Sequence, residues 1–259
     1  QNIEESSTAA ADTGMASGSY SETNVRQEGV DEGDTAKTDG TYLYVLKDKS
    51  DQIAIIDTRD NRMKQTATIT VEDVSEIQEM YLDIERNQLI AVCDGYVGGK
   101  WNDDDYGYGQ RTNTTAVTYD ISDRENPKEV GRVSQSGYYN SSRIADGYLY
   151  LFSDYYVTLD GITAKNPKSY IPLVNDNLIK ETDICLPSIS KADMYSIITS
   201  VSLENPNETA HSKALLADGG NLYVSNDNIY FYENVWQYSG KDVTTIRKVS
   251  YESGKLTAG

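Results

Sequence analysis

The side chains that could do chemistry in this chain are mostly carboxylates. Asp and Glu contribute 41 residues, whereas there is one histidine, His211, and there are two cysteines, Cys93 and Cys185. Neither cysteine has a second cysteine or a histidine at metal-ligand spacing, and no Gly-x-Ser-x-Gly stretch accompanies the histidine. His211 is predicted to lie in a polar stretch between two strands. Zinc sites with several histidines are excluded and a hydrolase triad has no support, so we assign no catalytic residue.

The densest acidic cluster is a weak candidate for a calcium loop. Asp103 and Asp105 lie in the run Asn102-Asp103-Asp104-Asp105, followed by Tyr106-Gly107-Tyr108-Gly109, so alternate oxygen donors precede a glycine. The twelfth position counted from Asp103 is Thr114, where a calcium loop has a bidentate Glu. A solvated loop is the favoured interpretation, with Ca²⁺ as the alternative and no other cofactor. Trp101, Tyr106 and Tyr108 could stack a sugar ring or a partner's side chain, or hold the loop in place.

The two cysteines leave two states open. They lie 92 positions apart, and an exported protein could join them in a disulfide. Two free buried thiols are the other state.

The net charge of −18 restricts the partners. A chain this acidic repels the phosphates of nucleic acids and anionic lipids, so we exclude both as primary ligands. A protein or a glycan remains, and the charge also favours solubility.

Short strands dominate the chain beyond residue 23. Runs of Tyr, Val, Ile and Leu alternate with polar residues and are bounded by Asp, Asn and Gly, whereas helical periodicity is nearly absent. The predicted strands are Tyr42–Leu46, Gln52–Asp57, Lys64–Val71, Leu89–Cys93, Thr115–Ile121, Tyr148–Ser153, Ser196–Leu203, Asn221–Val224, Ile229–Tyr232 and Thr244–Tyr251.

A turn followed by an aromatic or aliphatic strand recurs along the chain. It occurs at Asp39-Gly40, Asp146-Gly147 and Asp227-Asn228, with a degenerate copy at Arg86-Asn87. Such pairs supply the positive-φ residues of tight hairpins. The steps between positions 40, 87, 147 and 228 are 47, 60 and 81 residues. The first step fits a four-stranded propeller blade. The later steps are lengthened by insertions at about 96–113 and 160–193, which we place between the second and third strands of their blades.

These features predict an all-β chain, a β-propeller of four-stranded antiparallel blades. Residues 1–23 are predicted to be a flexible tether rich in Ser, Thr, Ala and Gly. Residues 24–259 hold about four blades, at 34–76, 77–135, 136–217 and 218–259. The register of the fourth blade is open, because Asp218-Gly219 competes as its turn, and this blade shows no clear outer strand.

The stretch from Thr23 to Gly40 resembles the start of a known family. It contains Asn24-Val25, Gly29-Val30-Asp31-Glu32, Asp34 and Lys37-Thr38-Asp39-Gly40 at unbroken spacing. This pattern is similar to that of secreted bacterial and archaeal proteins with a C-terminal β-propeller domain, distantly WD40-like. Further similarities are Asn140-Ser141-Ser142-Arg143-Ile144, Ser169-Tyr170-Ile171-Pro172 and Tyr223–Tyr230.

The resemblance implies a surface protein without established catalytic activity. It implies an extracellular location, with an N-terminal membrane segment that precedes this sequence. The family's propeller is longer than this chain, so a partial arc is favoured over a closed four-bladed ring. An open arc leaves sheet faces and edges uncovered, and we therefore expect self-association through them, or a partner that covers them.

A rim of the propeller is the predicted binding site. Loops between second and third strands lie on the same face as the connections that begin each blade, and long loops on one rim are common binding sites. The predicted binding residues are Asp31, Glu32, Asp34, Lys37, Arg143, Tyr138, Tyr139, Trp101, Tyr106 and Tyr108. The alternative is that they form turns and channel salt bridges.

Two functions follow from these observations. The first is a non-catalytic extracellular binding or scaffold module whose ligand the sequence does not name. The alternative is a carboxylate-based or calcium-assisted extracellular hydrolase acting on glycans, which requires two facing carboxylates in a deep cleft.

Overall fold

The computed structural model describes residues 30–48, 50–59, 63–96, 112–157, 164–186, 193–217, 221–236 and 242–258. They form strands β1 to β20 and two short 3-10 helices, η2 (Pro167–Ser169) and η3 (Glu181–Asp183). No helix in this part of the chain has the length and hydropathy to cross a membrane. The predicted tether, residues 1–23, lies outside the described residues.

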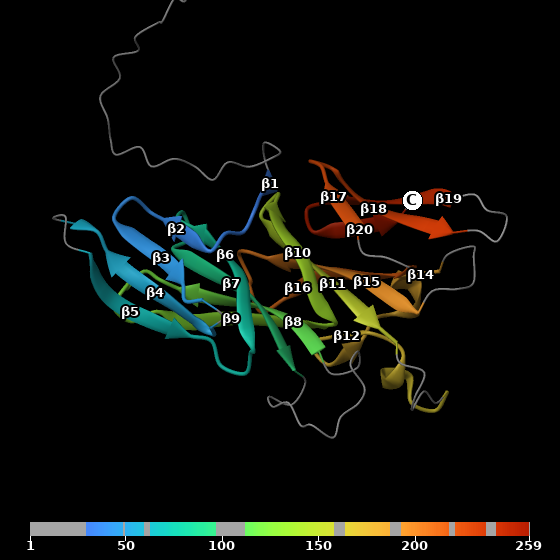
Figure 1. Ribbon diagram of the computed structural model, residues 1–259, viewed down its shortest axis with the longest axis horizontal. Helices are drawn as coiled ribbons and strands as arrows, with labels where there is room; N and C mark the ends of the chain where they lie inside the picture. Colours follow the sequence, from blue (N-terminus) through green and yellow to red (C-terminus); the bar gives the residue numbers. More distant parts are fainter. Residues whose placement is uncertain are drawn as a thin grey trace, which may run out of the picture.

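The strands form four sheets that follow one another along the chain (Figure 1). The first sheet contains β2 (Ala36–Thr38), β3 (Tyr42–Leu46), β4 (Gln52–Asp57) and β5 (Lys64–Thr70). The second sheet contains β6 (Glu76–Asp83), β7 (Gln88–Tyr96), β8 (Thr112–Asp120) and β9 (Lys128–Ser136), with β12 (Leu173–Val174) and β13 (Asn177–Leu178) added beyond β9.

The third and fourth sheets complete the arc. The third contains β10 (Tyr138–Ala145), β11 (Tyr148–Tyr156), β15 (Met194–Ser202) and β16 (Thr209–Ala217). β1 (Val30–Asp31) pairs with its β10 edge, and β14 (Ile184–Cys185) lies parallel to β16. The fourth contains β17 (Asn221–Val224), β18 (Asn228–Trp236), β19 (Asp242–Glu252) and β20 (Lys255–Ala258).

The four sheets form an open arc. Each sheet contacts the next one along the chain, through β2 and β6, β8 and β10, and β16 and β20. The first and fourth sheets lie at opposite ends of the view in Figure 1, so the described strands do not close into a ring. The predicted all-β class, with four-stranded antiparallel sheets in a partial propeller, is confirmed.

The predicted strands and turns are present, with two corrections. Every predicted strand overlaps a strand of the structure, and Asp227 precedes β18 as the turn anchor at position 228 predicts. Gly40 has a φ of +85° and Gly147 a φ of +76°, which these turns require. The fourth sheet does have an outer strand, β20, paired with β19. His211 lies within β16 and not between strands.

Both insertions fall between the second and third strands of their sheets. Residues 97–111, which separate β7 from β8, lie outside the described residues. The segment between β11 and β15 forms the hairpin β12–β13, whose Val174 pairs with Gln135 of β9, before β14 returns to β16. This insertion therefore leaves the third sheet, covers the outer edge of the second, and comes back.

The core is made of three apolar layers between consecutive sheets. Along β7, Leu89, Ala91 and Cys93 face the first sheet while Ile90 and Val92 face the third, and all five are buried. The layer between the third and fourth sheets includes Tyr150 against Tyr251, with ring centroids 4.6 Å apart. Both faces of an inner sheet are thus buried.

The two cysteines are free thiols. Cys93 lies in the layer between the first two sheets, and Cys185 packs against the layer between the last two. Burial raises the pKa of the Cys93 thiol, so it is protonated at neutral pH. Of the two states that the sequence left open, the structure has the free thiols, of which Cys93 is buried and Cys185 is half-buried.

Arg124 joins the first two sheets at the end of the arc where the first hairpins turn. Its guanidinium donates to Asp39 Oδ2 at 3.1 Å, to the Tyr44 hydroxyl at 3.2 Å and to Asn87 Oδ1 at 2.9 Å. Burial opposes ionisation of Asp39, but the N–H groups of Tyr42 and Thr41, together with Arg124, outweigh it and lower the pKa of this carboxyl. The largely buried pair gives the apolar contact of the two sheets a fixed register.

Hydrogen bonds across the last interface fix the fourth sheet in a similar way. The N–H of Ser253 donates to Asp146 Oδ2 at 2.7 Å, and the Ser200 hydroxyl donates to the carbonyl of Gly254. The N–H of Leu256 in β20 donates to His211 Nδ1 at 2.9 Å. Nδ1 therefore carries no proton, and Nε2 is the donor toward Asp183 Oδ1, 3.1 Å away.

We predict that Arg124→Ala lowers the free energy of unfolding by roughly 2–4 kcal/mol, because it removes the cation from the largely buried Asp39 carboxylate, which then accepts only the N–H groups of Thr41 and Tyr42 and the Tyr44 hydroxyl. Asp39 has a lower pKa folded than unfolded. Its contribution is therefore present above the ordinary value of 3.8 and is lost as the pH falls through the folded pKa. Urea unfolding of the wild type and of Arg124→Ala, at pH 5 and below pH 3, measures the free energy of unfolding. The decrease in this free energy between the two pH values should be smaller in Arg124→Ala than in the wild type.

Arg59→Ala is the matched control. Arg59 pairs with Asp57 on the surface, with a side chain 61% exposed, so its loss should cost less than about 1 kcal/mol. Equal losses in the two variants would show that Arg124 does not fix the interface.

We predict that His211→Ala accelerates hydrogen exchange at the Leu256 amide, because this N–H loses its acceptor at the edge of the fourth sheet. His211→Gln, which retains an acceptor oxygen, should restore part of the protection. Amide exchange measured for Lys255–Ala258 tests this, and unchanged protection in His211→Ala would contradict it.

Candidate functional site

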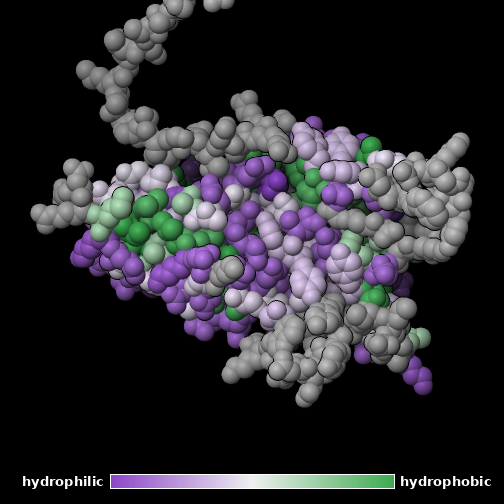
Figure 2. Space-filling view, in the orientation of Figure 1, coloured by the Kyte–Doolittle hydropathy of each residue, from purple (hydrophilic) through white to green (hydrophobic). Residues whose placement is uncertain are grey.

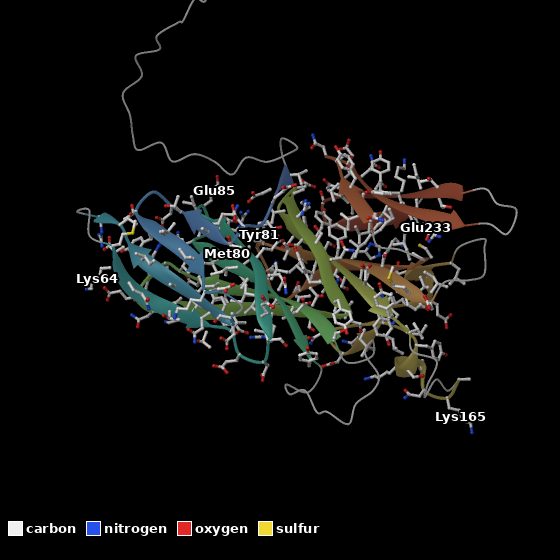
Figure 3. The ribbon with its side chains drawn as sticks, in the orientation of Figure 1. Lys64, Met80, Tyr81, Glu85, Lys165 and Glu233 are labelled. Atoms are coloured by element: carbon white, nitrogen blue, oxygen red, sulfur yellow. The ribbon has the colours of Figure 1, made fainter. Side chains whose placement is uncertain are left out.

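The first strands of three sheets bring polar side chains together at the inner edge of the arc. Lys37 pairs with Tyr44, Tyr81 with Ile90 and Arg143 with Tyr150, so the three occupy the same position of successive repeats. The ammonium of Lys37 lies 5.9 Å from the centre of the Tyr81 ring. Tyr81 and its neighbour Met80 are labelled in Figure 3, in the middle of the molecule. We call these side chains and those that bind them the inner-edge cluster.

Glu79 is the carboxylate at the centre of the inner-edge cluster. It accepts a hydrogen bond from the Tyr81 hydroxyl at 3.0 Å and one from the Ser142 hydroxyl, whose oxygen lies 2.9 Å from that of Tyr81. The pKa of Tyr139 is raised, mainly by burial and further by the charge and the hydrogen bond of Glu79. Burial and the same charge raise the pKa of Tyr81. Both phenols are therefore neutral donors near neutral pH.

The inner-edge cluster also binds the segment that leads into the first sheet. Lys37 Nζ lies 3.6 Å from Asp31 and donates to the carbonyl of Glu32 at 3.0 Å. Arg143 lies 3.4 Å from the carboxylate of Glu32. A Cβ on Gly33 would come within 2.3 Å of the Glu79 side chain, so a larger residue here would displace this carboxylate from its position in the cluster. The polar groups of the cluster largely satisfy one another and hold this segment across the inner edges.

The structure brings together five of the predicted binding residues: Asp31, Glu32, Lys37, Tyr139 and Arg143. Asp34 lies nearby and pairs with Met80 through the backbone. Tyr138 begins β10, whereas Asp31 pairs with Ile144 near its other end, so these two lie at opposite ends of one strand. Trp101, Asp103, Asp105, Tyr106 and Tyr108 lie outside the described residues. Within the described part, no group of three or more His, Cys, Asp or Glu could hold a metal ion.

Sequence reasoning missed Glu79, Tyr81 and Ser142. The degenerate turn at Arg86-Asn87 contained the signal, since aligning it with Asp39-Gly40 and Asp146-Gly147 places Tyr81 at the position of Lys37 and Arg143. Ser142 was named only within a similarity to the family, without a role.

Two half-buried carboxylates, Asp94 and Asp154, occupy a second repeat position, near the ends of β7 and β11. Burial raises the pKa of Asp94 and of Asp154. Each accepts a side-chain amide from the bulged residue of the preceding strand, Gln78 at 2.9 Å for Asp94 and Asn140 at 2.6 Å for Asp154. Asp94 also accepts the N–H of Tyr139, which joins the second sheet to the third. These contacts give both acids a role in holding the bulges.

A cleft opens on the rim where the second insertion returns to the second sheet. Its volume is about 610 Å³, within the range of small-molecule sites. Its floor is β8 and β9, with Asn113, Thr115, Ser134 and Ser136 on the face toward the first sheet. The β12–β13 turn contributes Asn175 and Asp176, the β5–β6 turn contributes Asp73, and the remaining wall includes Tyr96, Arg132 and Leu173. We call this feature the rim cleft.

Hydrogen bonds fix the walls of the rim cleft. Asn175 and Asp176 form a two-residue turn with φ values of +47° and +61°, and Asn175 Oδ1 accepts the N–H of Ser134 at 2.9 Å. Asn113 donates to the Ser134 hydroxyl at 3.1 Å, and its own buried Oδ1 has no hydrogen-bond partner among the described residues. The cleft is therefore largely preformed.

The rim cleft contains one paired cation and two carboxylates without a partner among the described residues. The guanidinium of Arg132 is held by both oxygens of Glu129, at 2.9 and 2.8 Å. The carboxylates of Asp73 and Asp176 have no hydrogen bond or ion pair with any other described residue. They are free to accept hydrogen bonds from hydroxyl or amino groups of a ligand. Sequence reasoning missed this site, because its lining comes from turns and strands far apart in the chain.

Comparisons with solved structures give only distant similarity. An acylaminoacyl peptidase of Pyrococcus horikoshii matches 88% of this chain and 32% of its own, at 9% identity and a TM-score of 0.41. A functionally unknown protein from Desulfotomaculum acetoxidans matches 92% of this chain and 70% of its own, at 10% identity and a TM-score of 0.28. Similarity this low supports no conclusion about function.

Comparisons of sequence are more specific. An uncharacterized protein of Methanocaldococcus jannaschii is 25% identical over 224 residues, which cover 83% of this chain and 29% of the relative. The chain thus spans less than a third of that relative. The family model described as "Beta propeller domain" matches residues 20–258. With its four-stranded sheets in an open arc, the chain belongs to the beta propeller domain family.

Proposed function

We propose that this chain is a non-catalytic binding or scaffold module of an extracellular protein, and that its ligand binds in the rim cleft. The observation that supports this most is a pair of exposed carboxylates, Asp73 and Asp176, that have no partner among the described residues and lie beside a polar floor of amides and hydroxyls. Side chains of these kinds recognise the hydroxyl groups of sugars through hydrogen bonds. A cell-surface glycan is the ligand class that this lining fits best, and an exposed protein segment is the alternative.

The location at the cell surface is a further part of the proposal. It is supported by the resemblance of residues 23–40 to secreted propeller proteins, and an N-terminal membrane segment outside this sequence would anchor the protein. The net charge of −18 is consistent with a ligand that is neither nucleic acid nor anionic lipid.

We predict that screening the chain against neutral glycans and peptidoglycan fragments will find a ligand whose affinity falls about tenfold in Asp73→Asn and in Asp176→Asn, because each loses a charged acceptor. Titration calorimetry measures the change. Glu204→Gln, an exposed acid on the turn after β15, is the matched control and should bind like the wild type.

The inner-edge cluster supplies the competing location. If the ligand binds at the inner edge, Asp31→Asn or Arg143→Ala will lose affinity for it. Asp73→Asn and Asp176→Asn will then bind it like the wild type, and that result would contradict the proposed cleft. Absence of any glycan or peptide ligand would contradict the binding function.

One observation favours the hydrolase alternative. Burial raises the pKa of Asp94 and Asp154, as a general acid requires. Assays of glycan hydrolysis, with and without Ca²⁺, test it, and activity that is lost in Asp154→Asn would replace the binding module by an enzyme.

A further inference from the structure

The two carboxylates of the rim cleft are fixed by the turns that carry them. Asp73 has a φ of +58° and Asp176 a φ of +61°, so each lies at a tightly turned position of the chain. The guanidinium of Arg132 donates to the carbonyl of Glu72 at 3.2 Å, which holds the β5–β6 turn against β9. The β12–β13 turn is held on β9 by its side-chain bond to that strand. A ligand that binds both carboxylates therefore does not have to order either turn.

The nitrogen donors that line the rim cleft already have acceptors. Asn113 Nδ2 donates to the Ser134 hydroxyl, and the N–H of Leu173 donates to the Ser136 hydroxyl at 2.9 Å. Arg132 is the one cation among the described lining residues, and all three of its guanidinium nitrogens donate to oxygens of the protein. The two serine hydroxyls keep one hydrogen each to donate. The lining therefore has few donors left for a ligand.

The lining has acceptors in excess. Besides the two carboxylates, the buried Asn113 Oδ1 has no hydrogen-bond partner among the described residues. It lies 2.6 Å from the point that a Cβ on Gly95 would occupy, and the carbonyl oxygen of Asp73 lies 3.4 Å from the same point. Because glycine has no side chain there, two acceptor oxygens approach one another beside the cleft. The unsatisfied groups of the described lining are thus mainly oxygens that need hydrogen donors, and two of them carry negative charge.

We propose that the rim cleft selects a primary ammonium group, and that its ligand is a glycan that contains an amino sugar. This inference rests on the proposed function, which places a glycan in the cleft. An ammonium group supplies three N–H donors and the positive charge that the carboxylates of Asp73 and Asp176 lack. A neutral sugar would displace water from both carboxylates without supplying a charge, and the lost hydration would reduce its affinity.

The floor of the cleft favours an amino sugar over a lysine side chain. The hydroxyls of Ser134 and Ser136 lie on the same floor as the amide of Asn113, and the three can exchange hydrogen bonds with ring hydroxyls. A lysine side chain has an ammonium group but only methylene groups behind it, which would leave these polar groups without partners. An amino sugar has an ammonium group and hydroxyls on one ring, which fits carboxylates beside a polar floor.

The charge of the whole chain favours the same ligand. A net charge of −18 attracts a cationic glycan and raises its concentration near the surface. Figure 2 shows hydrophilic side chains over the lower left of the view, where the first two sheets lie. Added salt screens this attraction, so the affinity for an amino sugar should fall as NaCl is added.

The experiment compares oligomers of glucosamine with oligomers of N-acetylglucosamine of the same length, by titration calorimetry on the chain of 259 residues. N-acetylation removes the ammonium group and keeps the ring hydroxyls. We expect the glucosamine oligomer to bind at least about tenfold more tightly at about pH 6 and low salt. Raising the pH to about 9 should abolish this preference, because the amine loses its proton while the carboxylates stay charged.

Variants of the two carboxylates locate the ammonium group. Asp73→Asn and Asp176→Asn should each reduce the preference for the glucosamine oligomer, and the double variant should bind both oligomers with equal affinity. Asparagine tolerates a positive φ as well as aspartate does, so the turns should keep their conformation, and circular dichroism of each variant checks the fold. Glu204→Gln removes an exposed acid outside the cleft and should keep the full preference.

Three outcomes would overturn the inference. Equal binding of the two oligomers by the wild type, with affinity still lost in Asp73→Asn, would refute selection of the ammonium group but leave the glycan-binding function standing. A preference that persists in the double variant would place the ammonium group elsewhere on the acidic surface.

The third outcome concerns the class of ligand. If a short lysine peptide binds more tightly than its Nε-acetylated form, and the two sugar oligomers bind equally, the ammonium group belongs to a protein and not to a glycan. Binding that requires Ca²⁺ and is lost on addition of EDTA would likewise replace the ammonium group by a metal ion between the carboxylates.

Discussion

An inner sheet of this chain has two apolar faces, and both must be removed from water. β7 shows the constraint most clearly, because Leu89 to Cys93 are all buried, with successive side chains on opposite faces. A sheet of a sandwich can turn a polar face to solvent, but a sheet with two apolar faces needs a neighbour on each side. Stacking sheet on sheet is the arrangement that satisfies this for successive repeats, and the arc follows from it.

Apolar packing is not directional, so the register between sheets requires polar contacts. Arg124 binds Asp39 and Tyr44 across the first interface, the Ser142 hydroxyl meets that of Tyr81 across the second, and His211 accepts the Leu256 N–H across the last. These bonds lie at strand ends or at the inner edge, where side chains from two sheets approach one another. The inner edge itself is covered by Val30 to Asp34, which pair with β10 and β6 and so occupy backbone groups that an edge would leave free.

The sequence predicted the second and third strands best, because the recurring Asp-Gly turn and strict alternation mark them. The first and fourth strands were harder to detect. β6, β9 and β10 each contain a bulge, at Gln78, Val130 and Asn140, and an inserted residue breaks the two-residue period on which the prediction depends. β16 begins with Thr-Ala-His-Ser, which lacks an apolar alternation although its later residues are buried.

Part of the inner-edge cluster could be predicted from the sequence, but the rim cleft could not, because its residues are brought together only by the fold. Lys37 and Arg143 belong to local patterns, whereas Asp73, Asn113 and Asp176 meet only because the insertion of the third sheet crosses to the second. The wall of the cleft therefore depends on the interface between these sheets. A ligand that binds the cleft only when this interface is intact must stabilise the interface by the same free energy. Ligand binding in the rim cleft, as proposed, would thus be thermodynamically coupled to the stacking of the second and third sheets.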